Sequence, residues 1–168
     1  MDDLSFYRNR FQEEAGFTQS VLEQLPHHRL DFRPHPKAPS ADELLWTIVR
    51  GLQIRLDIVK TYESDGPPIE PRPSYPEMVA SYLDLTQRIA EELGAVDEKR
   101  WTTKAQFRMN GRVALDWPVR DILWMFHFDM IHHRGQLTTY LRPLGARVPS
   151  IYGKSGDDAA VSIGDDLR

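Results

Sequence analysis

Three polar side chains lie on one face of the most apolar stretch of this sequence, and their types and spacing suit either a metal site or an ion pair. Asp129 and His133 are four residues apart, and Gln136 follows one turn later. In a helix such side chains stack on adjacent turns. A carboxylate and an imidazole placed in this way can supply two ligands for a divalent ion if other helices supply the rest. The same spacing also suits a buried Asp–His ion pair with a purely structural role.

These residues belong to the longest apolar-periodic run of the chain, residues 116–143. Pro118 and Pro143 stand where a helix tolerates proline, and Asp116 is an N-cap candidate, so the run predicts one long helix. Tyr140 falls on the same face as the three polar residues. Apolar residues occupy nearly the whole circumference, which indicates a helix buried on more than one side. We therefore expect one face to point into a bundle and another to be covered by loops or a second subunit.

Two amphipathic segments in the first half of the chain predict further helices. One spans about residues 3–25. The other begins at a capping box formed by Ser40 and Glu43 and runs to about Tyr62. Thr47 is the polar side chain near the middle of its core stripe, and the simplest interpretation is a hydroxyl bonded back to its own helix.

A third amphipathic segment, residues 74–94, begins at a second capping box formed by Ser74 and Glu77. It follows a proline-rich loop over residues 64–74 that is long enough to cross a bundle end. Asn110-Gly111 suggests a small β-hairpin with a type I′ turn. Residues 146–168 contain few apolar anchors and predict an irregular segment draped over the surface. The whole chain is thus expected to be a single all-α domain, a four-helix bundle with a long crossover loop.

Composition excludes several classes of protein. The net charge of −4 argues against a generic nucleic-acid binder, because no strongly basic face is implied. No apolar run is long enough for a membrane span and the acidic N-terminus has no signal-peptide core, so we expect a cytoplasmic location. The absence of cysteine excludes disulfides, a thiolate nucleophile and thiolate-bound zinc. A serine hydrolase is poorly supported, since no Gly-x-Ser-x-Gly elbow is present.

Two stretches of the sequence resemble the DinB/YfiT-like family of bacterial proteins. Residues 131–153 read IHHRGQLTTYLRPLGARVPSIYG, and residues 25–49 read LPHHRLDFRPHPKAPSADELLWTIV. The resemblance covers most of the chain in order. It implies a four-helix bundle, often a homodimer, in which three histidines hold a divalent metal such as nickel, zinc or iron. Some relatives are transferases or isomerases that use thiols such as mycothiol or bacillithiol.

This sequence departs from the implied metal triad at two of its three positions. His133 matches the last histidine, but the position four residues earlier is Asp129. The second-helix histidine, expected directly after a tryptophan, falls on Thr47. Aspartate is a competent ligand for a divalent ion, whereas a neutral threonine hydroxyl is a poor one.

The other side chains expected to line the pocket are His132, Gln136 and Tyr140. His132 is placed at the pocket edge, because it lies about 60° around the helix from Asp129. His127 points to a nearly opposite face and is predicted to be solvated or at an interface. Neither of these histidines supplies the missing ligand on the second helix.

Two functions from different classes remain open. One is a metal-dependent hydrolase or thiol-dependent transferase, in which Asp129 and His133 hold the ion and water or substrate completes its shell. The other is a non-catalytic dimeric bundle without a cofactor, whose pocket binds a small molecule or is purely structural. Stoichiometric metal in the purified protein would favour the first. A homodimer is expected in both, because one small bundle cannot easily cover a helix that is apolar nearly all round.

Overall fold

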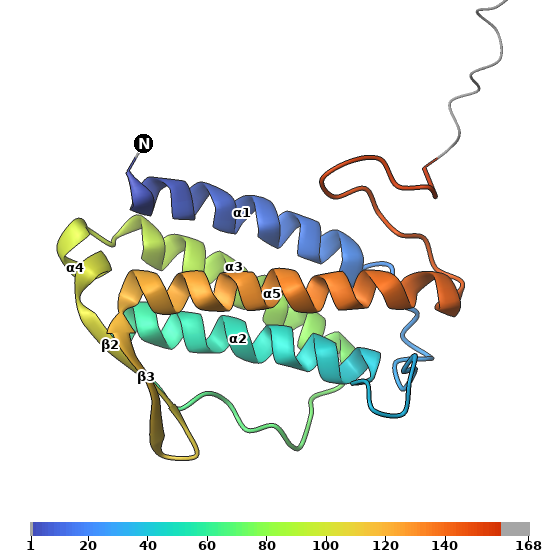
Figure 1. Cartoon of the computed structure of the whole chain (residues 1–168), viewed down its shortest axis with the longest axis horizontal. Helices are drawn as coiled ribbons and strands as arrows, with labels where there is room; N and C mark the ends of the chain where they lie inside the picture. The colour runs from blue at the N-terminus through green and yellow to red at the C-terminus, as the bar shows by residue number, and fades with distance from the viewer. Residues whose placement is uncertain (1, 159–168) are drawn as a thin grey trace, which may run out of the picture.

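The structure is a computed structural model that describes residues 2–158, in which four long helices pack side by side (Figure 1). They are α1 (Asp3–Leu22), α2 (Ala41–Thr61), α3 (Tyr75–Gly94) and α5 (Val119–Leu141). Both α1 and α2 pack against α3 and α5. The predicted four-helix bundle is therefore confirmed. Within residues 2–158, none of the helices combines the length and apolar character needed to cross a membrane.

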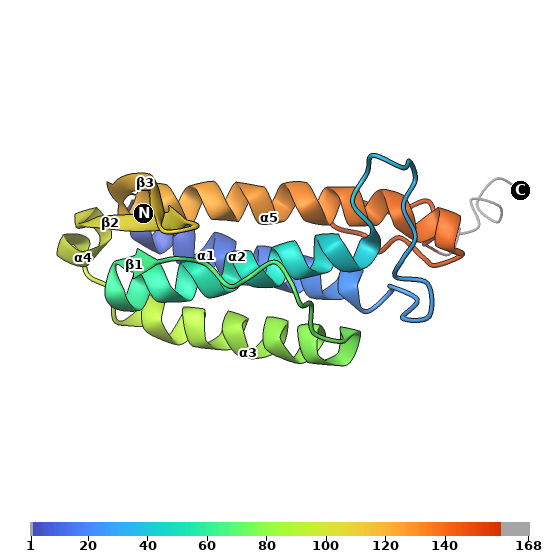
Figure 2. The same cartoon turned by 90° about the horizontal axis from the view of Figure 1, so that it is seen from below.

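The proline-rich segment between α2 and α3 is the predicted crossover loop. It leads along α2 from one end of the bundle to the other, so α2 and α3 run in the same direction (Figure 2). Two side chains of α2 form hydrogen bonds with the backbone of this loop. Trp46 Nε1 donates to the Ile69 carbonyl at 2.9 Å, and Arg50 Nε donates to the Pro67 carbonyl at 2.8 Å. These bonds keep the loop against the helix.

Both predicted capping boxes are present, at the starts of α2 and α3. The backbone N–H of Ser40 donates to the Glu43 carboxylate at 2.7 Å, and that of Ser74 donates to Glu77 at 2.7 Å. These contacts satisfy amides for which the first turn of a helix offers no partner. The local sequence therefore sets where both helices begin.

A small sheet lies at one end of the bundle (Figure 1). Its strands, in sheet order, are β1 (Glu63–Ser64), β2 (Lys104–Met109) and β3 (Arg112–Pro118). Asn110 and Gly111 have positive φ angles of 52° and 75°, which a type I′ turn requires, so the predicted hairpin is confirmed. The hairpin strand β2 contacts α2 and α5. Beside the sheet, the short helix α4 (Glu98–Thr102) buries Trp101, whose Nε1 donates to Asp3 at 2.8 Å.

Two helix boundaries differ from those that the sequence predicts. Asp116 is not the N-cap of the fourth helix, because the residues before Val119 are extended and pair with β2. Strand pairing and helix capping compete for the same backbone groups, and here pairing prevails. The first helix ends at Leu22 rather than near Leu25, since tighter i−3 hydrogen bonds lead the chain into Pro26.

The chain after α5 is irregular, as predicted for the beginning of the segment 146–168. A single 3₁₀ turn, η1 (Arg142–Leu144), precedes it. Tyr152 anchors this segment to the bundle, because its hydroxyl accepts from Arg134 Nη2 at 2.6 Å. The last part of the predicted segment, 159–168, lies outside the described residues.

The core between the helices is mainly apolar but includes charged and polar groups. Arg134 of α5 and Glu14 of α1 form an ion pair whose side chains are 2% and 5% exposed. His127 is 1% exposed, with its ring centroid 5.4 Å from that of Trp124 and 5.5 Å from that of Tyr7. Of the two positions predicted for His127, exposure to solvent is therefore wrong, and a position at an interface stays a prediction. Burial lowers the pKa of His127 to about 3, so the ring is neutral.

Candidate functional site

Asp129 and His133 lie on consecutive turns of α5 and contact each other. The Nε2 atom of His133 is 3.3 Å from Oδ1 of Asp129, and its Nδ1 atom is 2.8 Å from Oε1 of Gln136. An amide oxygen only accepts, so Nδ1 carries a proton, and a protonated Nε2 donates to Asp129. The helix itself therefore supplies partners for both ring nitrogens.

This ion pair is half-exposed rather than buried. The side chain of Asp129 is 43% exposed and that of His133 is 20% exposed. The hydrogen bond that the imidazole donates to Asp129 is the largest influence on His133; it outweighs burial and raises the pKa of His133. The charged form of the pair is thus favoured, but water screens it.

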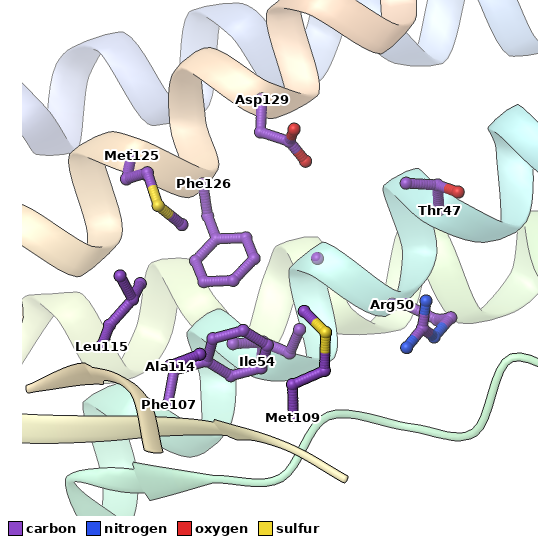
Figure 3. Close-up of a pocket in the computed structure, with 11 residues that line it drawn as sticks. Thr47, Arg50, Ile54, Phe107, Met109, Ala114, Leu115, Met125, Phe126 and Asp129 are labelled. Carbon is purple, nitrogen blue, oxygen red and sulfur yellow. The ribbon is translucent and has the colours of Figure 1, made fainter. Parts of the chain in front are cut away.

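Thr47 faces the same region from α2, as Figure 3 shows. Its hydroxyl donates to the Glu43 carbonyl one turn earlier at 2.8 Å, which confirms the interpretation of a hydroxyl bonded back to its own helix. Thr47 and Asp129 both line one pocket. Two of the three positions at which the family resemblance implies metal ligands therefore face a common cavity.

The pocket has a volume of about 340 Å³ and lies between α2, α5 and the β2–β3 hairpin (Figure 3). Its apolar wall consists of Ile54, Phe107, Met109, Ala114, Leu115, Met125 and Phe126. Phe107 and Phe126 meet edge to face, with ring centroids 5.3 Å apart. Met109, on the hairpin, is 58% exposed although it is apolar. A concave, largely apolar surface with few polar groups is typical of a small-molecule site.

The remaining residues predicted for the pocket lie further along α5. His132 is exposed, and Gln136 is half-buried beside His133. Tyr140 is buried, and its hydroxyl donates to the Pro39 carbonyl at 2.9 Å. The prediction that His132, Gln136 and Tyr140 line the pocket is therefore wrong for the pocket between α2, α5 and the hairpin, and His133 does not line it either. The ligand role assigned to Asp129 and His133 stays a prediction.

Arg50 also lines the pocket, and it was not among the site residues predicted from the sequence. It follows Thr47 by one helical turn on α2 (Figure 3), and the hydrogen bond from its Nε to the Pro67 carbonyl orients the guanidinium. Burial lowers the pKa of Arg50. The signal that could have identified it is its i+3 spacing from Thr47, which places both on one face.

The residues present do not fit a site with three histidines. Within residues 2–158, no group of three or more His, Cys, Asp or Glu side chains is arranged to hold a metal ion. Asp129 and His133 are two donors, and the third position is the neutral hydroxyl of Thr47. Protein metal sites of the zinc type use three or four strong donors, so this set is one ligand short.

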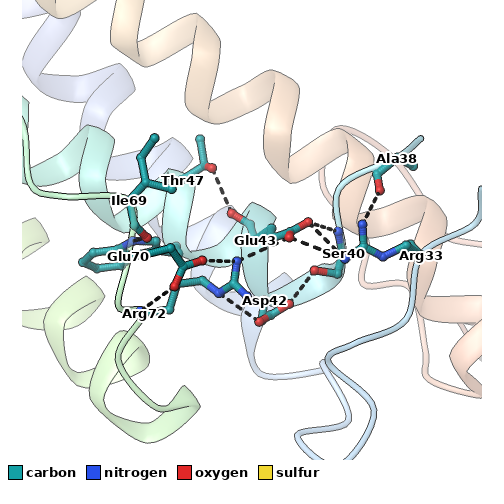
Figure 4. A network of polar contacts seen from close by, with 10 residues as sticks. Arg33, Ala38, Ser40, Asp42, Glu43, Thr47, Ile69, Glu70 and Arg72 are labelled. Atoms are coloured by element: carbon teal, nitrogen blue, oxygen red, sulfur yellow. Dashed lines mark hydrogen bonds and ion pairs between the residues drawn. The ribbon is translucent and has the colours of Figure 1, made fainter. Parts of the chain in front are cut away.

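The acidic residues at the start of α2 are committed to another role (Figure 4). Arg72 of the crossover loop contacts Glu70 at 2.9 Å, Asp42 at 3.2 Å and Glu43 at 3.3 Å. Arg33, in the loop between α1 and α2, contacts Glu43 at 3.4 Å. Capping of the Ser40 backbone is the main cause that lowers the pKa of Glu43. This network joins both loops to the first turn of α2, below Thr47.

Comparisons with known proteins agree on the fold. The DinB family matches residues 2–165. A DinB-like protein from Bacillus cereus ATCC 10987 is 24% identical with a TM-score of 0.72, over 87% of this chain and 95% of that chain. The DinB-like protein YjoA from Bacillus subtilis is 16% identical with a TM-score of 0.68, over 88% and 99%.

A more distant solved structure is that of a mycothiol-dependent maleylpyruvate isomerase. It is 12% identical to this chain with a TM-score of 0.52, over 89% of this chain and 66% of that chain. At these identities the likeness concerns the fold alone. A search of curated proteins found no match.

Proposed function

This chain belongs to the DinB family, and from that premise we propose that it binds a small, largely apolar molecule. The binding site is the pocket between α2, α5 and the β2–β3 hairpin. One observation carries the proposal. Thr47 and Asp129 occupy positions where the family resemblance implies metal ligands, yet they line an apolar cavity of about 340 Å³. The cavity is therefore present at the place where the resemblance implies three metal-binding histidines, although those histidines are not all present.

The hairpin supports this proposal. Met109 and Met125 face the cavity from the hairpin and from α5. Methionine side chains are flexible and polarisable, so they adapt to ligands of different shape. An apolar side chain that is 58% exposed, as Met109 is, gains burial when a ligand covers it.

A metal-dependent hydrolase or thiol-dependent transferase is the second candidate. One observation favours it: His133 Nε2 and Asp129 Oδ1 are 3.3 Å apart, which is close enough for both atoms to contact one ion. Elemental analysis of wild type beside His133→Ala tests it. Stoichiometric metal that is lost in the variant would support this candidate over the first.

The pocket is tested by a binding experiment with 4-phenylbutan-1-ol as a neutral apolar probe. Methionine ε-methyl groups labelled with ¹³C report the position of binding by NMR. The probe is expected to shift the Met109 and Met125 resonances and to leave Met78 and Met130, which are buried elsewhere in the core, unchanged. Shifts at all methionines, or at none, would contradict the proposal.

A homodimer formed through the α1–α5 face belongs to the same proposal. A groove of about 450 Å³ runs along this face, and the aromatic side chains of Phe6 and Phe128 on it are 46% and 62% exposed. Trp124 lies between them, with ring centroids 5.9 and 5.6 Å away. Light scattering of wild type beside Phe128→Glu measures the effect: the expected result is a dimer that the substitution dissociates, and a monomeric wild type would contradict it.

A further inference from the structure

Arg50 is the cationic side chain of the pocket, and its guanidinium is incompletely used. Its Nε donates to the Pro67 carbonyl at 2.8 Å. Within residues 2–158 the guanidinium makes no other hydrogen bond and no ion pair. Arg72, a half-buried arginine near the same loop, contacts three carboxylates. The Nη1 and Nη2 donors of Arg50 are therefore free for a group that enters the pocket.

The position of Arg50 favours a ligand over a purely structural role. The bond to Pro67 uses the Nε edge of the guanidinium and leaves both Nη atoms without a partner in the described part of the chain, while Arg50 is one of the side chains that line the pocket (Figure 3). A planar fork with two parallel donors matches the two oxygens of a carboxylate. The Arg50 side chain is half-buried and has therefore lost part of its hydration. A bound anion would replace the lost water contacts.

We propose that the ligand of this pocket is a monoanion: a carboxylate, bound by Arg50, attached to an apolar body that packs on Met109, Phe107 and Phe126. This inference rests on the proposed function and names its ligand class. Asp129 enters the pocket from the facing helix, and its charge is compensated by His133. The carboxylate is accordingly placed at the α2 side, and the apolar body lies between the hairpin and α5.

The balance of charge in the lining selects a carboxylate over a phosphate. The lining contains one cationic side chain, Arg50, and one carboxylate, Asp129. A phosphate dianion would need further cationic groups to offset its second charge. The apolar wall supplies the remaining contacts, which an aliphatic or aromatic body satisfies.

Three probes of matched shape test the inference: 4-phenylbutyrate, 4-phenylbutan-1-ol and 4-phenylbutylamine. Their affinities are measured by titration of the Met109 and Met125 methyl resonances. We expect the carboxylate to bind at least about tenfold more tightly than the alcohol, because hydrogen bonds to a charged group are stronger than neutral ones. The amine is expected to bind most weakly, because its ammonium group has the same charge as Arg50.

Two variants identify the residue responsible. Arg50→Gln is expected to abolish the preference for 4-phenylbutyrate, so that within this variant the carboxylate and the alcohol bind with about equal affinity. Arg88→Gln is the matched control, since it removes the same charge from an exposed position on α3. Arg50→Lys keeps the charge without the planar fork, and it is expected to retain only part of the selectivity.

The outcomes separate this inference from the proposed function. Equal affinity for all three probes, with shifts confined to Met109 and Met125, would overturn the carboxylate inference while the pocket remains. Equal losses in Arg50→Gln and Arg88→Gln would also overturn it, because the effect would then be one of net charge. If no probe shifts either methyl, the proposed function itself fails. Should Arg50→Gln not fold, the probe series on wild type and on Arg50→Lys decides the question.

Discussion

Replacing His133 by alanine is expected to cost about 0.5 to 1 kcal/mol of unfolding free energy near pH 5.5, and almost nothing near pH 8.5. The magnitude follows from exposure. Asp129 is 43% exposed and His133 is 20% exposed, so the pair resembles solvated i,i+4 pairs on helices. Removing one partner of a fully buried pair would instead cost about 3 to 5 kcal/mol.

The direction of the pH dependence follows from the imidazole. The hydrogen bond with Asp129 raises the pKa of His133 above its ordinary value of 6.5. Folding therefore favours the protonated ring. This contribution to stability is complete below pH 6.5 and is lost as the pH rises through the raised pKa.

Urea unfolding followed by circular dichroism, with a chelator present, measures this effect at both pH values. His132→Ala is the control, because it removes an exposed histidine from the same helix. Asp129→Asn is expected to repeat the loss at low pH. A loss of about 3 kcal/mol or more, or an equal loss at both pH values, would refute the reasoning.

Three further substitutions test other parts of the molecule. Thr47→His restores the second-helix histidine and is expected to raise the affinity for Ni²⁺, measured by calorimetry, by about tenfold or more, because position 47 lines the pocket. An unchanged affinity would mean that position 47 does not face Asp129 and His133. Gly51→Ala is expected to raise the free energy of unfolding in urea by about 0.5 to 1 kcal/mol, since its methyl would lie 3.8 Å from Phe126, and a destabilised variant would indicate crowding. Glu14→Gln is expected to cost about 3 kcal/mol or more in the same assay, because Arg134 stays buried without its counter-charge; a loss below about 1 kcal/mol would contradict this.

The helices were predictable because their signals are local. The capping boxes at Ser40 and Ser74 act through backbone amides three residues away, and the structure contains both. The Asn110-Gly111 turn was predictable for the same reason, since its φ angles depend on these two residues. Asp116 was wrongly predicted to be an N-cap, because it lies in a strand whose pairing with β2 depends on residues further away in the chain.

The site was only partly predictable, because it depends on how the hairpin packs. Helical periodicity placed Thr47 and Asp129 on inward faces, but it could not show that β2 lies across α2 and α5. The pocket therefore lies nearer the beginning of α5 than Gln136 and Tyr140. Arg50 was missed because a single arginine on a helix forms no motif, and its significance comes from the carbonyl of Pro67.

Buried polar residues escaped prediction for a similar reason. The apolar period of a helix identifies a face, but not which polar residues on it find partners. His127 was assigned to solvent or to an interface because it lies on the helix face nearly opposite Asp129, whereas its ring packs against Trp124 and Tyr7. The cytoplasmic location expected from the sequence stays a prediction.

A crystal structure of the wild-type protein with 4-phenylbutyrate tests the central proposal most directly. The expected result is electron density for the probe between α2, α5 and the hairpin, with its carboxylate on the Nη atoms of Arg50 and its ring against Met109 and Phe126. Density for the probe elsewhere, such as the groove between α1 and α5, with this pocket unchanged, would contradict the proposal.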